Sequence, residues 1–315
     1  MKTNSVHIIL KVIASILCIL IGATFIFSGF SKIPTLEQFG WTIVETTPFN
    51  WTMAEWSARL LIGLEIFLGV LFIAHIKIKK IAIPLSIGLL TVFTIYLLLV
   101  IKVNGSSGNC GCFGEVLPMT PLQSVWKNVA MLVVIGIIFL LQHEFKFKYI
   151  GIITGSILLV AILIPFVMSP PESIYIYTKE KDINEPIPLS ILYNSDSNKP
   201  PTQELRKGKN VIAFMSLTCE HCRKAAKRMR IMKEKHPELP FYFVLNGDST
   251  NLSDFIQDTK ATNIPYSIFI GAPQFIELNR GSAVPSIKWI KDTTLVRESN
   301  YITLDDADIL KWMKE

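Results

Sequence analysis

Five long apolar segments fill the first half of the chain and restrict what it can fold into. A helix needs roughly 20 consecutive apolar residues to cross a bilayer. Segments close to this length occupy about residues 8–30, 56–76, 81–101, 125–141 and 149–168. The charged residues gather after Pro170. We therefore predict an α-helical membrane bundle over residues 1–168, a linker over 169–188 and a separate domain over 189–315.

The lysines predict the orientation of these spans. Lysine clusters follow the second and fourth spans, at residues 77–80 and 146–148, and such clusters favour the cytoplasmic side. Five spans then place the N-terminus in the cytoplasm and the C-terminal domain in the periplasm of a bacterial inner membrane. Orientation in the lipid membrane and a solvated face on the helix after Cys222 explain most of the net charge of +6, so we expect no nucleic-acid partner. Residues 31–56, with three tryptophans, are expected to form an interfacial loop.

Glu65 is an ionisable residue in the middle of the second span. Such a group is costly in a membrane, so it should face the bundle interior or a hydrated cavity. One hypothesis gives Glu65 a role in proton movement coupled to thiol oxidation. The alternative is a neutral acid that forms hydrogen bonds between helices.

The tetrapeptide Cys219-Glu220-His221-Cys222 is the strongest chemical signal in the chain. It follows the apolar run 211–217 and precedes a basic stretch without Pro or Gly. This pattern predicts a buried strand that leads into a helix whose first turn carries two thiols. Cysteines at i and i+3 share one face of a helix and are close enough to bridge.

The position of the two thiols predicts their roles. The helix dipole, and His221 when protonated, should stabilise a thiolate at Cys219, whereas Glu220 opposes it. Cys219 is then the nucleophile and Cys222 the resolving thiol. The alternatives are a structural disulfide, or half of a zinc site with His221 as third ligand.

The remainder of the C-terminal region has a mixed α/β pattern. The predicted strands are 191–193, 211–217, 241–245, the run after Pro285 and an edge strand at 295–296. One predicted helix begins at Cys219, and two others cover 252–259 and 304–313. The last helix is expected to have its cap near Thr303 or Asp305.

Cys110 and Cys112 form a second pair in the loop after the third span. A disulfide from i to i+2 is strained, Gly111 supplies the backbone freedom it needs, and strained disulfides are better oxidants. The predicted topology places both pairs on the same side of the membrane, where they could exchange through a mixed disulfide. A permanent bridge or a metal site is the alternative.

The C-terminal motifs resemble the thioredoxin superfamily. Ala283-Val284-Pro285-Ser286 precedes an apolar run about where that fold places its cis-proline, which in the family faces the dithiol across the substrate groove. The long interval between Cys222 and Pro285 looks more like the membrane-tethered TlpA/ResA-type members. Many family members carry a buried acid six residues before the first cysteine, where this chain has Ala213.

The N-terminal region resembles the DoxX/MauE group of small membrane proteins over roughly residues 8–142. The resemblance lies in Ser28-Gly29-Phe30-Ser31-Lys32 after the first span, in Glu65, and in Cys110-Gly111-Cys112-Phe113-Gly114. MauE-type members are implicated in periplasmic disulfide formation, and other relatives in quinone-coupled sulfur oxidation. The resemblance therefore implies a possible quinone cofactor; no metal is expected.

Together these signals predict a membrane-bound thiol-disulfide oxidoreductase. The main hypothesis is oxidation of periplasmic thiol proteins through a relay between Cys219/Cys222 and Cys110/Cys112, with Pro285 shaping the groove. The alternatives are a reductive relay for periplasmic proteins or cytochrome maturation, and an assembly protein that binds copper or zinc. Reduction would need electrons from the cytoplasm, and no cysteine pair lies within the spans to carry them. The oligomeric state stays open.

Overall fold

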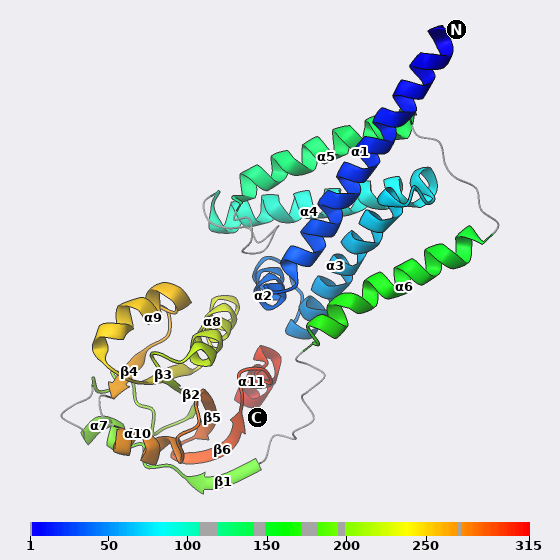
Figure 1. Cartoon of the computed structure of the whole chain (residues 1–315). Helices are drawn as coiled ribbons and strands as arrows, with labels where there is room; N and C mark the ends of the chain where they lie inside the picture. Colours follow the sequence, from blue (N-terminus) through cyan, green and yellow to red (C-terminus); the bar gives the residue numbers. More distant parts are fainter. Residues whose placement is uncertain (1, 107–118, 142–148, 172–181, 195–198, 270–271) are drawn as a thin grey trace. The chain divides into compact units, whose positions relative to one another are not determined.

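The computed structural model describes residues 2–106, 119–141, 149–171, 182–194, 199–269 and 272–315. The chain divides into two compact units, Met1–Pro171 and Glu172–Glu315 (Figure 1). The first unit is helical, and the second is built on a mixed β-sheet.

The first unit contains six α-helices and one π-helical segment among its described residues: α1 (Lys2–Lys32), α2 (Leu36–Thr46), α3 (Trp51–Ile73), η1 (Ile78–Ala82), α4 (Ile83–Asn104), α5 (Pro121–Leu141) and α6 (Ile150–Met168). Five stretches are long and apolar enough to cross a membrane: Ile8–Lys32, Trp51–Ile73, Ile78–Lys102, Pro121–Leu141 and Ile150–Met168. The prediction of about five spans is confirmed. The fourth span begins at Pro121, earlier than predicted, because proline is tolerated in the first turn of a helix.

Helix α2 corrects the prediction of a loop over residues 31–56. Its buried residues are Leu36, Phe39, Gly40, Ile43 and Val44. They recur every three or four positions, which is the spacing of one face of a helix. The charged and aromatic residues of this segment suggested an interface and concealed that spacing.

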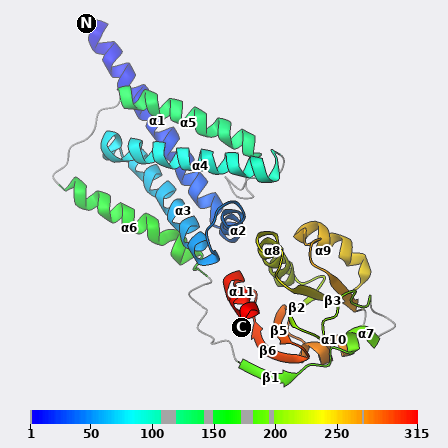
Figure 2. The ribbon, with the colours of Figure 1, turned by 180° about the vertical axis from the view of Figure 1, so that it is seen from behind.

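Helix α3 is the centre of the membrane unit and contacts α1, α2 and α6, while α4 and α5 lie side by side (Figures 1 and 2). Gly22 and Gly69 allow α1 and α3 to cross closely, because a Cβ atom on either glycine would lie 2.7 Å from the carbonyl oxygen of the other. Gly63 has the same role against α6, where its Cβ would lie 2.9 Å from the Cα of Ile162. Small residues at helix crossings are typical of membrane bundles.

The second unit contains one six-stranded sheet of order β1-β6-β5-β2-β3-β4 among its described residues. The strands are β1 (Asp182–Pro186), β2 (Lys209–Ser216), β3 (Phe241–Asn246), β4 (Tyr266–Phe269), β5 (Ser286–Lys291) and β6 (Thr294–Ser299). Strands β2, β3 and β4 are parallel, and β5, β6 and β1 continue the sheet in antiparallel pairs. The helices are α7 (Ile191–Asn194), α8 (Glu220–Lys235), α9 (Leu252–Thr259), α10 (Ala272–Asn279) and α11 (Asp306–Lys314), and a 3₁₀ turn, η3 (Ser249–Asn251), precedes α9.

This arrangement confirms the thioredoxin-like α/β fold. A parallel β2-α8-β3 unit is followed by an antiparallel β5-β6 hairpin and the closing helix α11, with β2 between β3 and β5. The predicted strands at β2, β3 and β5 and the predicted helices α8, α9 and α11 are present. The cap of α11 is Asp305, whose carboxylate accepts a hydrogen bond from the backbone N–H of Ala307.

Three details of the sequence prediction for this unit were wrong. Residues 191–193 begin a short helix, α7, and not a strand. Strand β6 is not an edge strand, because β1 pairs with it, and β1 itself lies in the range predicted as linker. Strand β4 and helix α10 were not predicted; they lie in the long interval between Cys222 and Pro285.

Candidate functional site

The Cys219/Cys222 dithiol lies where β2 leads into α8. Cys219 is the N-cap residue of α8 and has an extended backbone, and Cys222 is in the first turn. The backbone N–H of Cys219 donates to the Ser216 carbonyl at 3.3 Å, and the Cys219 carbonyl accepts from the N–H of Arg223 at 3.1 Å. The prediction of a strand followed by a helix that carries both thiols in its first turn is therefore confirmed.

The two thiols differ in accessibility. Cys219 is partly exposed, whereas Cys222 is fully buried. Burial raises the pKa of the Cys222 thiol, and a hydrogen bond with Cys219 raises it further, although the N–H of Ser216 donates to its Sγ at 3.3 Å and acts in the opposite direction. An incoming substrate can therefore reach Cys219 first, and Cys222 lies behind it as a protonated thiol.

Arg223 holds the segment before the dithiol in place. Its guanidinium donates to the Leu217 carbonyl at 3.2 Å and to the Asp254 carbonyl at 3.3 Å. It also pairs with Asp258 of α9 at 3.4 Å. These contacts join the strand-to-helix turn to α9, and the sequence analysis gave Arg223 no role.

Glu220 and His221 lie on the exposed surface between the two cysteines. The His221 ring packs beside the buried Tyr301, with 6.4 Å between ring centroids. The segment after β6 therefore lies beside His221, which stands between the two cysteines in the sequence. That neighbour of His221 could not be identified from sequence spacing.

Pro285 and the dithiol lie at the same end of the neighbouring strands β5 and β2. Strand β5 starts immediately after Pro285 and runs antiparallel to β2, with Ser286 opposite Phe214. The start of β5 therefore lies beside the end of β2 that leads to Cys219. The Val284–Pro285 peptide is cis, as the resemblance implied. The side-chain amide of the buried Asn279 donates to the carbonyls of Gly281 and Ala283 at 3.0 and 2.9 Å. These hydrogen bonds hold the loop that precedes Pro285.

A buried lysine, Lys288, follows Pro285 along β5 and pairs with a glutamate of β6. Lys288 is 1% exposed and donates to Oε1 of Glu298 on β6 at 3.0 Å. Ser286 donates to the same carboxylate oxygen at 2.7 Å. Burial raises the pKa of Glu298, but the hydrogen bonds from Ser286 and Lys288 outweigh it and leave the pKa below its usual value. The position of the family acid, Ala213, is buried and apolar.

Glu65 lies in the interior of the membrane unit, as predicted, and it has a charged partner that the sequence analysis missed. The Lys32 ammonium donates to its two carboxylate oxygens at 2.6 and 2.7 Å and to Ser28 Oγ at 2.9 Å. Ser28 Oγ also donates to Glu65 at 3.1 Å. Both charged side chains are 4% exposed. The signal was present in the i, i+4 spacing of Ser28 and Lys32, which places both on one face at the end of α1.

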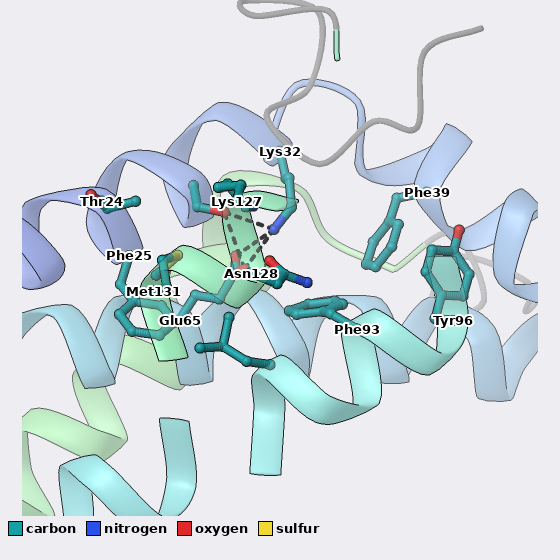
Figure 3. Close-up of a pocket in the computed structure, with 12 residues that line it drawn as sticks. Thr24, Phe25, Lys32, Phe39, Glu65, Phe93, Tyr96, Lys127, Asn128 and Met131 are labelled. Carbon is teal, nitrogen blue, oxygen red and sulfur yellow. Dashed lines mark hydrogen bonds and ion pairs between the residues drawn. The ribbon is translucent and has the colours of Figure 1, made fainter. Parts of the chain in front are cut away.

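A narrow cavity opens beside this ion pair (Figure 3). The rings of Phe93 and Tyr96 on α4 form one wall. The polar side chains that line it are Thr24, Ser28, Lys32, Glu65, Lys127 and Asn128. The Lys32 ammonium lies 4.8 Å from the centroid of the Phe93 ring. The side chains of α1, α2, α3, α4 and α5 together therefore form a partly polar recess inside the bundle.

Cys110 and Cys112, the second predicted pair, lie outside the described residues. Their pairing and their role stay predictions.

The comparisons with known proteins agree with the division into two units. Residues 10–141 match the family model described as methylamine utilisation protein MauE. The first unit contains a MauE-type membrane domain. The chain is also 29% identical to Protein TlpB of Flavobacterium psychrophilum over 332 aligned positions, which cover 90% of each protein. TlpB is thus a homologue along nearly the whole chain, and the match continues beyond the MauE-type domain into the thioredoxin-like unit.

Two solved structures are similar to the C-terminal part. One is a secreted Mycobacterium tuberculosis disulfide oxidoreductase homologous to E. coli DsbE, with 12% identity, a TM-score of 0.28 and coverage of 34% of this chain and 81% of that one. The other is the thioredoxin domain of a thiol-disulfide oxidoreductase from Bacteroides vulgatus, with 15% identity, a TM-score of 0.30 and coverage of 42% and 91%. The thioredoxin-like fold of the second unit is assigned from its strand order and from the position of the dithiol at the start of α8, and not from these two similarities.

Proposed function

We propose that the protein is a membrane-bound thiol-disulfide oxidoreductase that oxidises thiols of periplasmic proteins. The observation that carries this proposal is the dithiol: a partly exposed Cys219 caps α8, and a buried Cys222 lies one turn behind it. This asymmetry separates a thiol that meets the substrate from a thiol that resolves the mixed disulfide.

The exchange proceeds in two steps from the oxidised Cys219–Cys222 form. A substrate thiolate attacks Sγ of Cys219, the Cys219–Cys222 bond breaks, and Cys222 leaves with the electron pair. The N–H of Ser216 stabilises that sulfur at 3.3 Å, and the raised pKa of Cys222 then favours its protonation. A second thiolate of the same substrate molecule then attacks the substrate sulfur of the mixed disulfide. This step forms the disulfide of the substrate and releases Cys219 as a thiolate. The substrate has lost two electrons, and the dithiol has gained them.

The reduced dithiol must then be reoxidised, and we assign that step to a relay through Cys110/Cys112 to a quinone in the membrane. The resemblance to the DoxX/MauE group supports the acceptor, and the positive-inside pattern supports a periplasmic C-terminal unit in a bacterial inner membrane. Cys18 is the only cysteine of the five spans, so the spans contain no thiol pair that could bring electrons from the cytoplasm. This supports oxidation over reduction.

Glu65 is a candidate for the proton movement that accompanies reoxidation. Disulfide formation releases two protons along with two electrons, and Glu65 with its partner Lys32 forms a buried charged pair beside a cavity inside the bundle. Glu65→Gln should therefore slow quinone-dependent turnover and change its pH profile. Full turnover of this variant at all pH values would remove Glu65 from the mechanism.

Purified full-length protein tests the exchange itself. Its oxidised form should introduce disulfides into a reduced, unfolded protein substrate, and Cys219→Ala should abolish this activity. Cys222→Ser, with Cys219 first converted to a mixed disulfide with glutathione, should instead accumulate a mixed disulfide between Cys219 and the substrate as the glutathione thiolate leaves. Cys18→Ala is the matched control, because it removes a buried thiol of α1 and should leave the rate unchanged.

Two results would contradict the proposal. One is an undiminished rate for Cys219→Ala. The other is loss of wild-type activity on treatment with a chelator, which would favour the metal-binding assembly protein instead.

A further inference from the structure

We infer that Glu298 is a positioning residue of the dithiol site. Through a hydrogen bond with Ser286, it holds the loop of residues 280–285, the Pro285 loop, in the position that a protein substrate requires. The inference rests on the proposed function for the exchange reaction, and on the contacts of β5 and β6 for the residue and its role. The sequence analysis gave Glu298 no role, because this glutamate lies on β6, far from both cysteines in the sequence.

The Pro285 loop lies where a substrate meets this unit. Ser282 and Ala283 are exposed, and Val284 and Pro285 are half-buried. The loop leads into β5, which starts beside the end of β2 that precedes Cys219. A protein chain bonded to Cys219 therefore meets the loop, and the position of the loop affects how well that chain fits.

On the side before Pro285, the loop is held by its own residues. The amide of Asn279 donates to two of its carbonyls. Arg280 pairs with Glu185 of β1, and the side chain of Val284 packs against the hydrophobic core. None of these contacts reaches the residue that follows Pro285.

On the side after Pro285, the loop is held through Ser286. This residue is 7% exposed, and its hydroxyl donates to Oε1 of Glu298 at 2.7 Å; we call this hydrogen bond the loop anchor. Burial raises the pKa of Glu298, but the hydrogen bonds from Ser286 and Lys288 outweigh burial, so the acceptor is a carboxylate at neutral pH. Hydrogen bonds to a charged acceptor are stronger than those between neutral groups. Because Ser286 is bonded directly to Pro285, the loop anchor limits the movement of the loop.

A plainer role for Glu298 is to pair with Lys288 and join β5 to β6. That role uses only the contact of 3.0 Å between Lys288 Nζ and Oε1 of Glu298, and it makes no use of Ser286. Removal of one donor at a time separates the two roles. Ser286→Ala removes the loop anchor and leaves the ion pair, whereas Lys288→Met removes the ion pair and leaves the loop anchor.

The test compares two reductants of the oxidised, purified full-length protein. A reduced, unfolded protein contacts the surface around Cys219, whereas dithiothreitol requires access to Cys219 alone. We expect Ser286→Ala and Glu298→Leu each to lower the second-order rate constant with the protein substrate by about fivefold, the effect of losing one good hydrogen bond. Their rate constants with dithiothreitol should fall much less.

Three further variants serve as controls. Lys288→Met is the matched control, because it removes the other hydrogen bond to the same carboxylate oxygen, and it should react with the protein substrate like the wild type. Glu298→Gln should also react like the wild type, since its amide oxygen can accept the hydrogen bond from Ser286. The double variant Ser286→Ala/Glu298→Leu should be no slower than Glu298→Leu, because the two residues act through one contact.

Equal rate constants of Ser286→Ala and Lys288→Met with the protein substrate, or an equal fall with both reductants, would overturn the inference. Hydrogen exchange of the backbone amides in residues 281–286 gives a second readout that requires no thiol reaction. Ser286→Ala should speed this exchange, and Lys288→Met should not. If the wild type reacted with neither reductant, the proposed function would fail, whereas equal amide exchange in the two variants would overturn the loop anchor itself.

Discussion

Each unit of this protein buries a lysine against a glutamate, but the two pairs differ in their access to water. In the membrane unit, Lys32 and Glu65 are both 4% exposed. In the thioredoxin-like unit, the Lys288 side chain is 2% exposed and Glu298 is 43% exposed. Both members of the membrane pair are therefore shielded from water, whereas Glu298 of the second pair is in contact with solvent.

The difference determines what happens when one partner is removed. A charge left alone in a dry interior has no water to replace its partner, so its desolvation cost is uncompensated. A charge at the surface is hydrated after its partner has gone. The membrane pair should thus respond equally to loss of either member, and the pair between β5 and β6 should respond unequally.

The largest effect is expected for the membrane pair. Glu65→Leu and Lys32→Met should each lower the free energy of unfolding by about 3–5 kcal/mol, the usual cost of an orphaned buried charge. Unfolding of the purified protein in detergent, followed by tryptophan fluorescence, measures this. The double variant restores charge balance and should be more stable than either single variant. A double variant as unstable as the two single losses combined would contradict the ion-pair interpretation.

The two substitutions in the Lys288–Glu298 pair of the thioredoxin-like unit should have an intermediate and a small effect on stability. Glu298→Leu leaves Lys288 buried without its carboxylate and should cost about 1–3 kcal/mol. Lys288→Met leaves Glu298 in contact with water and should cost below about 1 kcal/mol. Hydrogen exchange of the β5 and β6 amides in the full-length protein reports both effects. Equal losses from the two substitutions would show that the exposure of Glu298 has no influence.

The same pair predicts a dependence of stability on pH. The pKa of Glu298 is lowered from 4.5 in the folded protein. Its stabilising contribution is therefore fully present above pH 4.5 and is lost as the pH falls through the lowered value. Glu298→Gln should flatten the acid limb of the exchange profile for β5 and β6. An unchanged acid limb would contradict the assignment.

The smallest expected effect concerns the reactivity of the two thiols, Cys219 and Cys222, toward alkylation, and not the stability of the fold. In the reduced protein at neutral pH, iodoacetamide should modify Cys219 before the buried Cys222. Because the pKa of Cys222 is raised from its ordinary value of 9.0, its alkylation in a Cys219→Ser variant should keep rising above pH 9.0, by about tenfold per pH unit. A plateau below pH 9.0, measured by mass spectrometry, would show that Cys222 is not the shielded thiol.

The spans and the dithiol could be predicted because each is a local signal. Twenty apolar residues define a membrane helix without reference to its neighbours, and a thiol pair after a buried strand defines its own geometry. Glu65 could be placed in the interior for the same reason, since an ionisable group cannot face lipid cheaply. Its partner Lys32 is 33 positions away, and only helix packing brings the two together.

The errors lie where tertiary contacts decide the structure. Strand β1 forms because β6 offers an unpaired edge, and nothing in its five residues predicts that pairing. Residues 191–193 include the β-branched Ile191 and the aromatic Tyr193, yet they form the start of α7, which buries Leu192 in the hydrophobic core. Asn128 and Phe93 belong to a cavity that exists only once five helices have packed around it.

The redox state of Cys219 and Cys222 in cells, with and without quinone, tests the oxidative relay most directly. Acid quenching followed by thiol alkylation preserves that state. We expect a mostly oxidised pair that becomes reduced when quinone is withdrawn. A pair that is mostly reduced whether or not quinone is present would contradict oxidation and would point to a partner that delivers electrons.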